Sequence, residues 1–223
     1  MHKKMIFIDL THLIKNEMPC FKAEWHCKTS MQQMGSISNV GRNTTKLLFG
    51  SHCGTHIDAP AHFIKDGRTI DQIGLDELVG PVSIFDFSHL HNNEEITVKM
   101  LENLTITPKI IFYFNWAKYF HDQKSFYSNY PFISDEACDF LIEKKVRLIG
   151  MDTPSPDDSR IKLGSENDSK IHKKLLSANI ILIEYLNNLD KLNDYSNWII
   201  SAMPLKLENC DGSPARVCLF KEK

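Results

Sequence analysis

Four short apolar runs constrain the fold of this chain more than any other feature. Each run is rich in β-branched or aromatic residues and is bounded by Gly, Pro, Asp or Asn. Because the runs are largely apolar rather than alternating, they predict strands that are buried in a sheet. The runs are Val82–Phe87, Lys109–Phe114, Val146–Met151 and Ile180–Glu184. A further strand is predicted at Met5–Leu10, ahead of a polar, loop-like region from about Lys15 to Arg42.

Helical patterns lie between these runs. Ser134 suits a helix N-cap, because two acidic residues follow it and apolar residues then recur at helical spacing. Shorter candidates are Val98–Leu104 and Asp168–Ala178. Strands that alternate with modest helices predict a mixed α/β fold. No repeat, low-complexity tract or composition shift marks a linker, so we expect one domain over residues 1–223.

A segment of the chain between positions 51 and 63 concentrates the candidate chemistry. His52, His56, His62 and Asp58 lie within eleven residues of one another. Imidazole nitrogen and carboxylate oxygen are the ligands that Zn²⁺ prefers, with Mn²⁺ or Fe²⁺ as alternatives. A His-rich surface loop is the competing interpretation, but such a loop has no need for ligands spaced so closely.

The spacing within this segment separates two roles. Gly54 and Pro60 disfavour a regular helix, so we expect a tight loop after a strand at Lys46–Phe49. A His-x-x-x-His-x-Asp pattern supplies three ligands and leaves a coordination position open, as catalytic sites require. His62 would then lie beside the metal or carry a proton, since imidazole titrates near pH ~6.5. Cys53 could be a ligand, but we expect its thiol to point away.

Polar residues at the ends of two other elements are weaker candidates. His172 lies in a helical run, Glu184 ends an aliphatic strand, and residues 150–156 place polar groups just past a strand. A carboxylate directly after four aliphatic residues can mark a site at a strand end. Spacing alone, however, leaves these residues as readily on the solvated surface.

Charge and cysteine usage exclude several classes of function. A net charge of −2 without a basic block argues against nucleic acid or a membrane surface as the main partner. The sequence has neither a signal-peptide core nor a membrane span. Six scattered cysteines without a Cys-x-x-Cys pair predict free thiols in a reducing cytoplasm. No Gly-x-Ser-x-Gly elbow supports a serine hydrolase.

The His segment resembles the His-x-Gly-Thr-His-x-Asp-Ala-Pro-x-His signature of the cyclase-like metal-dependent hydrolases. That family includes bacterial kynurenine formamidase (arylformamidase) and isatin hydrolase. The resemblance extends in order along nearly the whole chain. It covers Ile8–His12, His52–Phe63, Gly150–Ser155, Ile183–Asp190, Met203–Leu205 and Asp211–Arg216.

The resemblance implies a role for each matching residue. His52, His56 and Asp58 would bind one metal ion, and Asp58 would bridge to a second ion held by His172 and Glu184. His62 would be the proton donor and acceptor. The implied fold is a swivelling β/β/α domain with a mixed sheet, assembled as a homodimer or a larger homo-oligomer.

Two departures from the family pattern concern the substrate pocket. Kynurenine formamidases tend to carry Trp-Pro-Gly-Asp near the N-terminus, whereas this chain has Pro19–Trp25 without the Pro-Gly turn. We expect Phe21 to occupy the aromatic, substrate-binding position. The family's Thr-Gly-Trp becomes Phe114-Asn115-Trp116. Neither change touches the expected metal ligands.

Together these features predict a zinc- or manganese-dependent hydrolase of an amide C–N bond in a small molecule. N-formyl-kynurenine, another aryl formamide or a cyclic amide would be the substrate, with Phe21 or Trp25 stacking on its ring. The alternative is a family member that binds a metal or a small molecule without turnover. An intact His62 argues against that alternative, because a binding protein needs no proton carrier.

Overall fold

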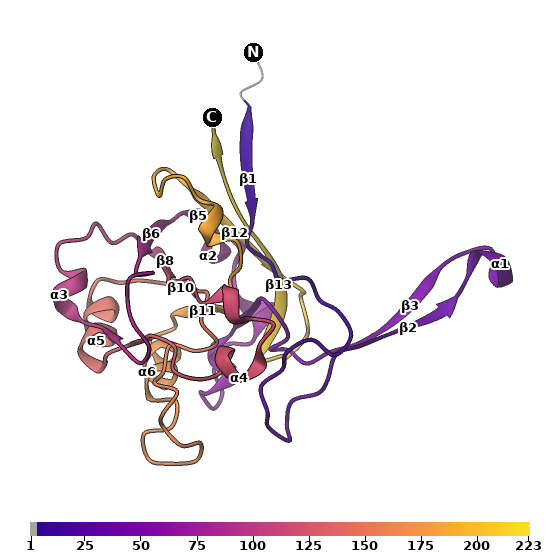
Figure 1. The fold of residues 1–223 in the computed structure, drawn as a ribbon, viewed down its shortest axis with the longest axis horizontal. Coiled ribbons are helices and arrows are strands. Elements are labelled where there is room, and N and C mark those ends of the chain that lie inside the picture. Colours follow the sequence, from indigo (N-terminus) through magenta and orange to yellow (C-terminus); the bar gives the residue numbers. More distant parts are fainter. Residues whose placement is uncertain (1–3) are drawn as a thin grey trace.

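One large mixed sheet organises the molecule (Figure 1). The computed structural model describes residues 4–223. The strand order in this sheet is β5-β12-β13-β4-β11-β10-β8-β6, and β1 pairs with β13 beside this path. The strands are β1 Met5–Asp9, β4 His56–Asp58, β5 Val79–Pro81, β6 Ser83–Asp86, β8 Lys109–Tyr113, β10 Leu148–Met151, β11 Ile181–Glu184, β12 Ile199–Pro204 and β13 Gly212–Glu222. The predicted mixed α/β fold is therefore confirmed.

The four apolar runs form strands, as predicted, and these strands make up the parallel half of the sheet. Strands β6, β8, β10 and β11 pair in parallel, with Leu148 opposite both Lys109 and Ile181. Helices α3 (Val98–Leu101), α5 (Asp135–Glu143) and α6 (Lys170–Ser177) lie along this half (Figure 1). The predicted N-cap of α5 is present, since the Ser134 hydroxyl accepts a hydrogen bond from the Ala137 amide.

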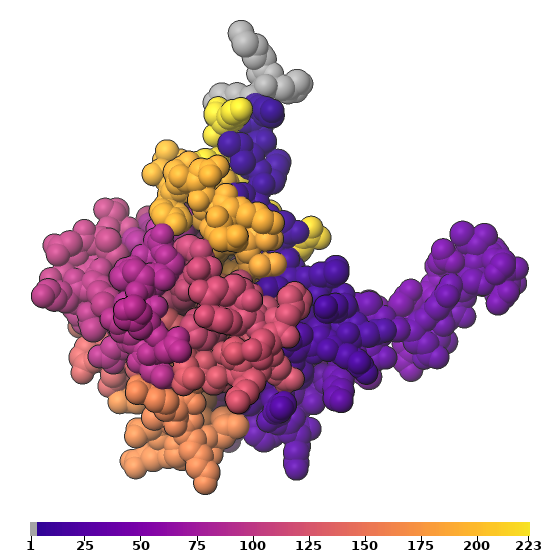
Figure 2. Space-filling model, viewed as in Figure 1, coloured from indigo at the N-terminus to yellow at the C-terminus, as the bar shows by residue number. Residues whose placement is uncertain are grey.

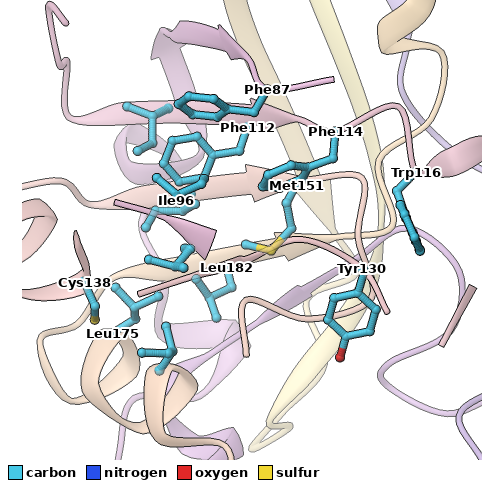
Figure 3. Close-up of a cluster of buried hydrophobic side chains, with 14 of the residues drawn as sticks. Phe87, Ile96, Phe112, Phe114, Trp116, Tyr130, Cys138, Met151, Leu175 and Leu182 are labelled. Carbon is cyan, nitrogen blue, oxygen red and sulfur yellow. The ribbon is translucent and has the colours of Figure 1, made fainter. Parts of the chain in front are cut away.

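Burial on both faces explains why these runs are largely apolar. Along β8, Ile110 and Phe112 pack into one hydrophobic cluster, while Ile111 and Tyr113 pack into a second cluster on the opposite face. Figure 3 shows the first cluster, in which Phe112 lies near Phe87. Phe114 and Trp116, which come after the end of β8, extend the cluster. Successive side chains of β8 thus alternate between two hydrophobic cores, rather than between a core and the solvent.

The antiparallel half brings the two ends of the described chain together. Strand β13 pairs with β4 through Gly212–Pro214, then with β12 and β1 further along. The register Met5 opposite Glu222 places both ends on one two-stranded ribbon (Figure 1).

The prediction of a loop for the whole His segment was wrong over His56–Asp58. These residues form β4, which is hydrogen-bonded to β11 on one side and to β13 on the other. Only the flanks are irregular: Gly54 turns the chain with a φ of 60° before the strand, and a 3₁₀ helix follows at Pro60–His62. A three-residue strand is too short to produce a recognisable periodicity.

A hairpin arm projects from the body of the molecule (Figures 1 and 2). Strands β2 (Ser30–Gly35) and β3 (Thr44–Leu48) pair antiparallel, and the short helix α1 (Ile37–Val40) forms the tip. The predicted loop from Lys15 to Arg42 was therefore wrong over β2 and α1. Neither face of this ribbon is buried, so its strands carry no apolar period that sequence patterning can detect.

The remaining elements are short and complete the connections. They are β7 Glu95–Ile96, β9 Phe132–Ile133, α2 Leu75–Leu78, α4 Gln123–Phe126 and the 3₁₀ helices η1 Pro60–His62, η2 Ile70–Gln72, η3 Ala117–Tyr119 and η4 Leu189–Lys191. Over residues 4–223, no helix combines the length and apolar character needed to cross a membrane.

Candidate metal centre

The centre of the sheet brings together residues that lie far apart in the sequence. His56 and Asp58 project from the same face of β4, because side chains two residues apart on a strand share a face. Ile57 between them is buried in the core. The register places His56 opposite Glu184 at the end of β11. His172 reaches the same place from α6.

Four side chains surround Asp58 in two groups. His52 Nδ1 lies 2.7 Å and His56 Nε2 3.2 Å from Asp58 Oδ1. His172 Nε2 lies 3.5 Å from Asp58 Oδ2 and 3.0 Å from Glu184 Oε1. Within each group, the ligand atoms all lie within 4.8 Å of one another. Asp58 therefore offers one oxygen to each group.

Each histidine is oriented by an outer partner on its other ring nitrogen. His52 Nε2 lies 2.7 Å from Asp211 Oδ2, and His56 Nδ1 lies 2.8 Å from the Gly54 carbonyl. His172 Nδ1 lies 2.5 Å from Asp157 Oδ2. An N–H on the outer nitrogen leaves the inner nitrogen with a lone pair, as a metal ligand needs.

These donors fit a divalent metal ion. The buried Asp58 Oδ2 atom has no hydrogen-bond partner among the described residues. A buried carboxylate oxygen without a partner is costly unless it binds a cation. Imidazole and carboxylate donors facing one point are the ligands of transition-metal sites.

The pKa values show how the cluster behaves without a metal. Burial lowers the pKa of His56, but hydrogen bonds and charge from Asp58 and Glu184 outweigh it and raise the pKa to about 10. The pKa of His172 is likewise raised, against burial, by Asp157, Asp58 and Glu184. Burial would raise the pKa of Asp58, yet the surrounding histidines hold it well below its usual range. Protons on the imidazoles therefore balance the carboxylates when no metal is bound.

His62 lies beside this cluster on η1. Its ring centroid is 3.9 Å from that of His52, and its Nδ1 is 3.1 Å from Asp211 Oδ2. About a quarter of its side chain is exposed, in contrast to the buried His56. His62 therefore faces the cavity that leads to the cluster.

That cavity has a volume of about 660 Å³. Aromatic side chains form its walls: Phe21 packs edge-on against Tyr127, and the Tyr185 ring lies 5.0 Å from that of His56. Trp25 is exposed at the rim. The lining, as far as the structure describes it, contains several carboxylates but no lysine or arginine.

The structure brings the residues singled out in the sequence to one place. Residues His52, His56, Asp58, His172 and Glu184 form the cluster, and His62 and Phe21 line the cavity beside it. The thiol of Cys53 points away, as expected, toward Thr29 Oγ1 at 3.1 Å and Met18 Sδ at 3.5 Å.

Within residues 150–156, Asp152 lies outside this cavity. Its carboxylate accepts hydrogen bonds from the backbone amides of Phe114, Trp116 and Ala117. It thereby ties the chain after β8 to the end of β10.

Sequence reasoning missed three residues of the site. Asp157 and Asp211 orient histidines, and Tyr185 packs on His56 with a φ of 55°, which is strained for an aromatic residue. The hydroxyl of Thr55 donates a hydrogen bond to the Tyr185 carbonyl at 2.6 Å. Nothing in the spacing of these residues indicated a role, since each depends on contacts between distant segments.

Comparison with known proteins identifies the family. A cyclase family model, described as "Putative cyclase", matches residues 8–158. A kynurenine formamidase of Bacillus cytotoxicus is 30% identical over 217 residues, covering 96% of each chain. A kynurenine formamidase of Geobacillus thermodenitrificans is 29% identical over 222 residues, covering 96% of this chain and 97% of the relative.

Solved structures agree in fold. An isatin hydrolase bound to the product analogue thioisatinate aligns with a TM-score of 0.87 at 25% identity, covering 98% of this chain and 93% of that chain. A "predicted metal-dependent hydrolase from Bacillus stearothermophilus" aligns with a TM-score of 0.77 at 30% identity, covering 97% and 98%. The chain therefore belongs to the cyclase family and is a metal-dependent amide hydrolase.

Proposed function

We propose that the cluster holds two divalent metal ions that share Asp58. His52 and His56 complete the first site, while His172 and Glu184 complete the second. The observation that carries this proposal is the position of the buried Asp58 carboxylate, whose two oxygens face separate groups of donors. Zn²⁺ is the metal we favour, since imidazole and carboxylate ligands suit it, and Mn²⁺ is the second candidate.

The proposed reaction is hydrolysis of an amide in a small molecule. A bound divalent ion supplies Lewis acidity, which lowers the pKa of water toward ~7 and polarises the substrate carbonyl. His62 accepts the proton of the attacking water and returns it to the leaving nitrogen as the C–N bond breaks. The products are a carboxylic acid and an amine.

N-formyl-kynurenine is one candidate substrate, by similarity to the kynurenine formamidase relatives. Phe21 in the cavity wall and Trp25 at its rim offer aromatic faces to the ring of an aryl formamide.

A neutral cyclic amide is the second candidate. The described lining includes Asp157, Asp158 and Asp168 but no lysine or arginine that would pair with a substrate carboxylate. The fold similarity to isatin hydrolase points to the same substrate class.

A panel of substrates tests the function and separates the candidates. Hydrolysis of N-formyl-kynurenine, formanilide and isatin would be followed by product absorbance before and after chelation. We expect activity that chelation abolishes and added Zn²⁺ or Mn²⁺ restores. A preference for isatin over N-formyl-kynurenine in kcat/KM favours the cyclic amide. Full activity after complete metal removal would overturn the proposal. Tight binding without turnover would favour a binding protein instead.

We also propose that this chain works as a homo-oligomer in a reducing cytoplasm. The β2–β3 arm exposes apolar side chains to solvent. They are Met34, Ile37, Val40, Leu47 and Leu48. A second copy of the chain would cover such a surface. The six cysteines are all free, which is consistent with a reducing compartment.

A further inference from the structure

Asp211 connects two histidines to which the proposed function gives different tasks. Its Oδ2 atom lies 2.7 Å from His52 Nε2 and 3.1 Å from His62 Nδ1. One carboxylate oxygen thus accepts hydrogen bonds from both rings at once. The two rings lie face to face at a tilt of 34°, so a movement of one disturbs the other.

The sheet holds Asp211 in place for these contacts. The Asp211 carbonyl accepts a hydrogen bond from the Ala59 amide at 2.9 Å, and the next residue, Gly212, pairs with Asp58. A Cβ atom on Gly212 would lie 2.9 Å from His52 Cε1 and 2.6 Å from the Ile57 carbonyl oxygen. Only glycine lets β13 approach closely enough for the Asp211 carboxylate to meet His52.

The two hydrogen bonds decide which nitrogen of each ring is free. Without a metal, both ring nitrogens of His52 face carboxylate oxygens, Nδ1 toward Asp58 and Nε2 toward Asp211, and both donate hydrogen bonds. A metal ion would replace the Nδ1 proton, and the Nε2–H group that donates to Asp211 would then fix Nδ1 as the ligand atom. His62 Nδ1–H donates to the same oxygen, which leaves Nε2 as the nitrogen that exchanges a proton with substrate. A carboxylate that orients an imidazole in this way fixes both its tautomer and its ring plane.

We propose that Asp211 is a positioning residue that couples the first metal site to the proton carrier, through His52 on one side and His62 on the other. The predicted effect on turnover rests on the proposed role of His62. The predicted effect on metal affinity does not depend on His62; it rests on the proposed role of His52 as a ligand. Asp211 lines the cavity, and among the described contacts its side chain reaches the proposed metal site only through His52. Its effect on metal affinity passes through His52 and its effect on turnover through His62.

The Asp211→Asn variant tests the effect on metal affinity, with the metal as the only added ligand. The asparagine side chain has the same shape but is uncharged. Its oxygen can still accept a hydrogen bond from a ring N–H, whereas its NH₂ group cannot. We expect the affinity for the first Zn²⁺ equivalent, measured by chelator competition, to fall by about 10–100-fold. Glu208→Gln removes an exposed carboxylate from the same loop and should leave that affinity unchanged.

A double-mutant cycle tests whether the effect of Asp211 on turnover passes through His62. At saturating metal, Asp211→Asn should lower kcat by about tenfold or more while KM changes little. In a His62→Ala background the same substitution should have no further effect on kcat, because the ring on which it acts is absent. The loss of metal affinity should persist in that background, because His52 is still present.

Nitrogen chemical shifts of the histidine rings give a readout that does not depend on activity. In the metal-free protein, Asp211→Asn and Asp211→Ala should both change the ring nitrogen shifts of His52 and His62, which lose their shared carboxylate partner, while the shifts of His56 and His172 stay as in the wild type. Native metal affinity and native ring shifts in both variants would overturn the proposal. So would an undiminished effect on kcat in the His62→Ala background. If His62→Ala itself retained full turnover, the proposed proton carrier would fail while the effect on metal affinity remained testable.

Discussion

At the scale of single residues, His62 should be separable from the metal ligands. His62→Ala is expected to lower kcat by about 10²–10⁴-fold, because the substitution removes the proposed proton carrier. Metal content, measured by elemental analysis, should stay at the wild-type value, since His62 is not among the donors around Asp58 but belongs to a more exposed group with His52 and Asp211. The exposed His91→Ala variant is the matched control and should keep full activity. Loss of metal together with activity in His62→Ala would place this residue among the ligands.

The raised pKa of His56, about 10, predicts how stability depends on pH. In the unfolded chain this imidazole titrates near pH ~6.5. The stabilisation is therefore fully present below about pH 6.5 and is lost as pH rises toward the folded value. The melting temperature of the metal-free protein should fall over this range. Metal binding requires deprotonated ligands, so the stabilisation by added Zn²⁺ should grow over the same range.

Thermal unfolding at pH 6, 7.5 and 9, with and without Zn²⁺, measures this dependence. A His56→Gln variant controls for the titration of all other side chains. Without metal, its melting temperature should fall less steeply with rising pH than that of the wild type. A metal-free wild-type protein that became more stable as pH rose would contradict the assignment.

At the scale of elements, Thr55 ties the start of β4 to the end of β11. Its buried hydroxyl donates to the Tyr185 carbonyl at 2.6 Å and accepts from the His12 amide at 2.9 Å. Thr55→Val keeps the shape of the side chain but leaves both backbone groups unpaired. We expect the free energy of unfolding to fall by about 2–3 kcal/mol.

Urea denaturation of Thr55→Val measures that loss, with Thr45→Val on the exposed face of β3 as the control. The control should stay within about 0.5 kcal/mol of wild type. Because Thr55 also helps to hold Tyr185 at a φ of 55°, kcat/KM should fall in Thr55→Val but not in the control. An unchanged stability would show that the two backbone groups find other partners.

Local pattern and family signature predicted different parts of this site. The apolar runs predicted β6, β8, β10 and β11 well, because strands buried on both faces have a composition that solvent-exposed segments lack. The residues that cluster around Asp58 were singled out through the spacing of the His segment and the resemblance of the whole chain, and their role as ligands stays a prediction. Asp157 and Asp211 were missed because their roles depend on loops folding back onto distant histidines. The β2–β3 arm was missed because it packs against nothing that would impose an apolar period.

At the scale of the whole molecule, the arm should decide the state of assembly. Ser30 and Leu48 are paired across the base of the arm, so an Asn-Gly turn can replace residues 31–47 without moving the body. We expect the full chain to sediment as a homodimer or larger species and the shortened chain as a monomer that still binds metal. Leu205→Asp, which changes an exposed apolar residue elsewhere, should leave the assembly intact. A monomeric full-length protein, or a shortened protein that stays assembled, would contradict this assignment.

The position of β4 between β11 and β13 has a consequence for how the protein is made. The strand that carries His56 and Asp58 leaves the ribosome early, but both of its neighbours, Ile181–Glu184 and Gly212–Pro214, are synthesised much later. A nascent chain therefore carries three histidines and a carboxylate without the strands that align them. Loading of the proposed metal site would therefore wait until translation is almost complete, and chains that terminate early should emerge without metal and with their central sheet open.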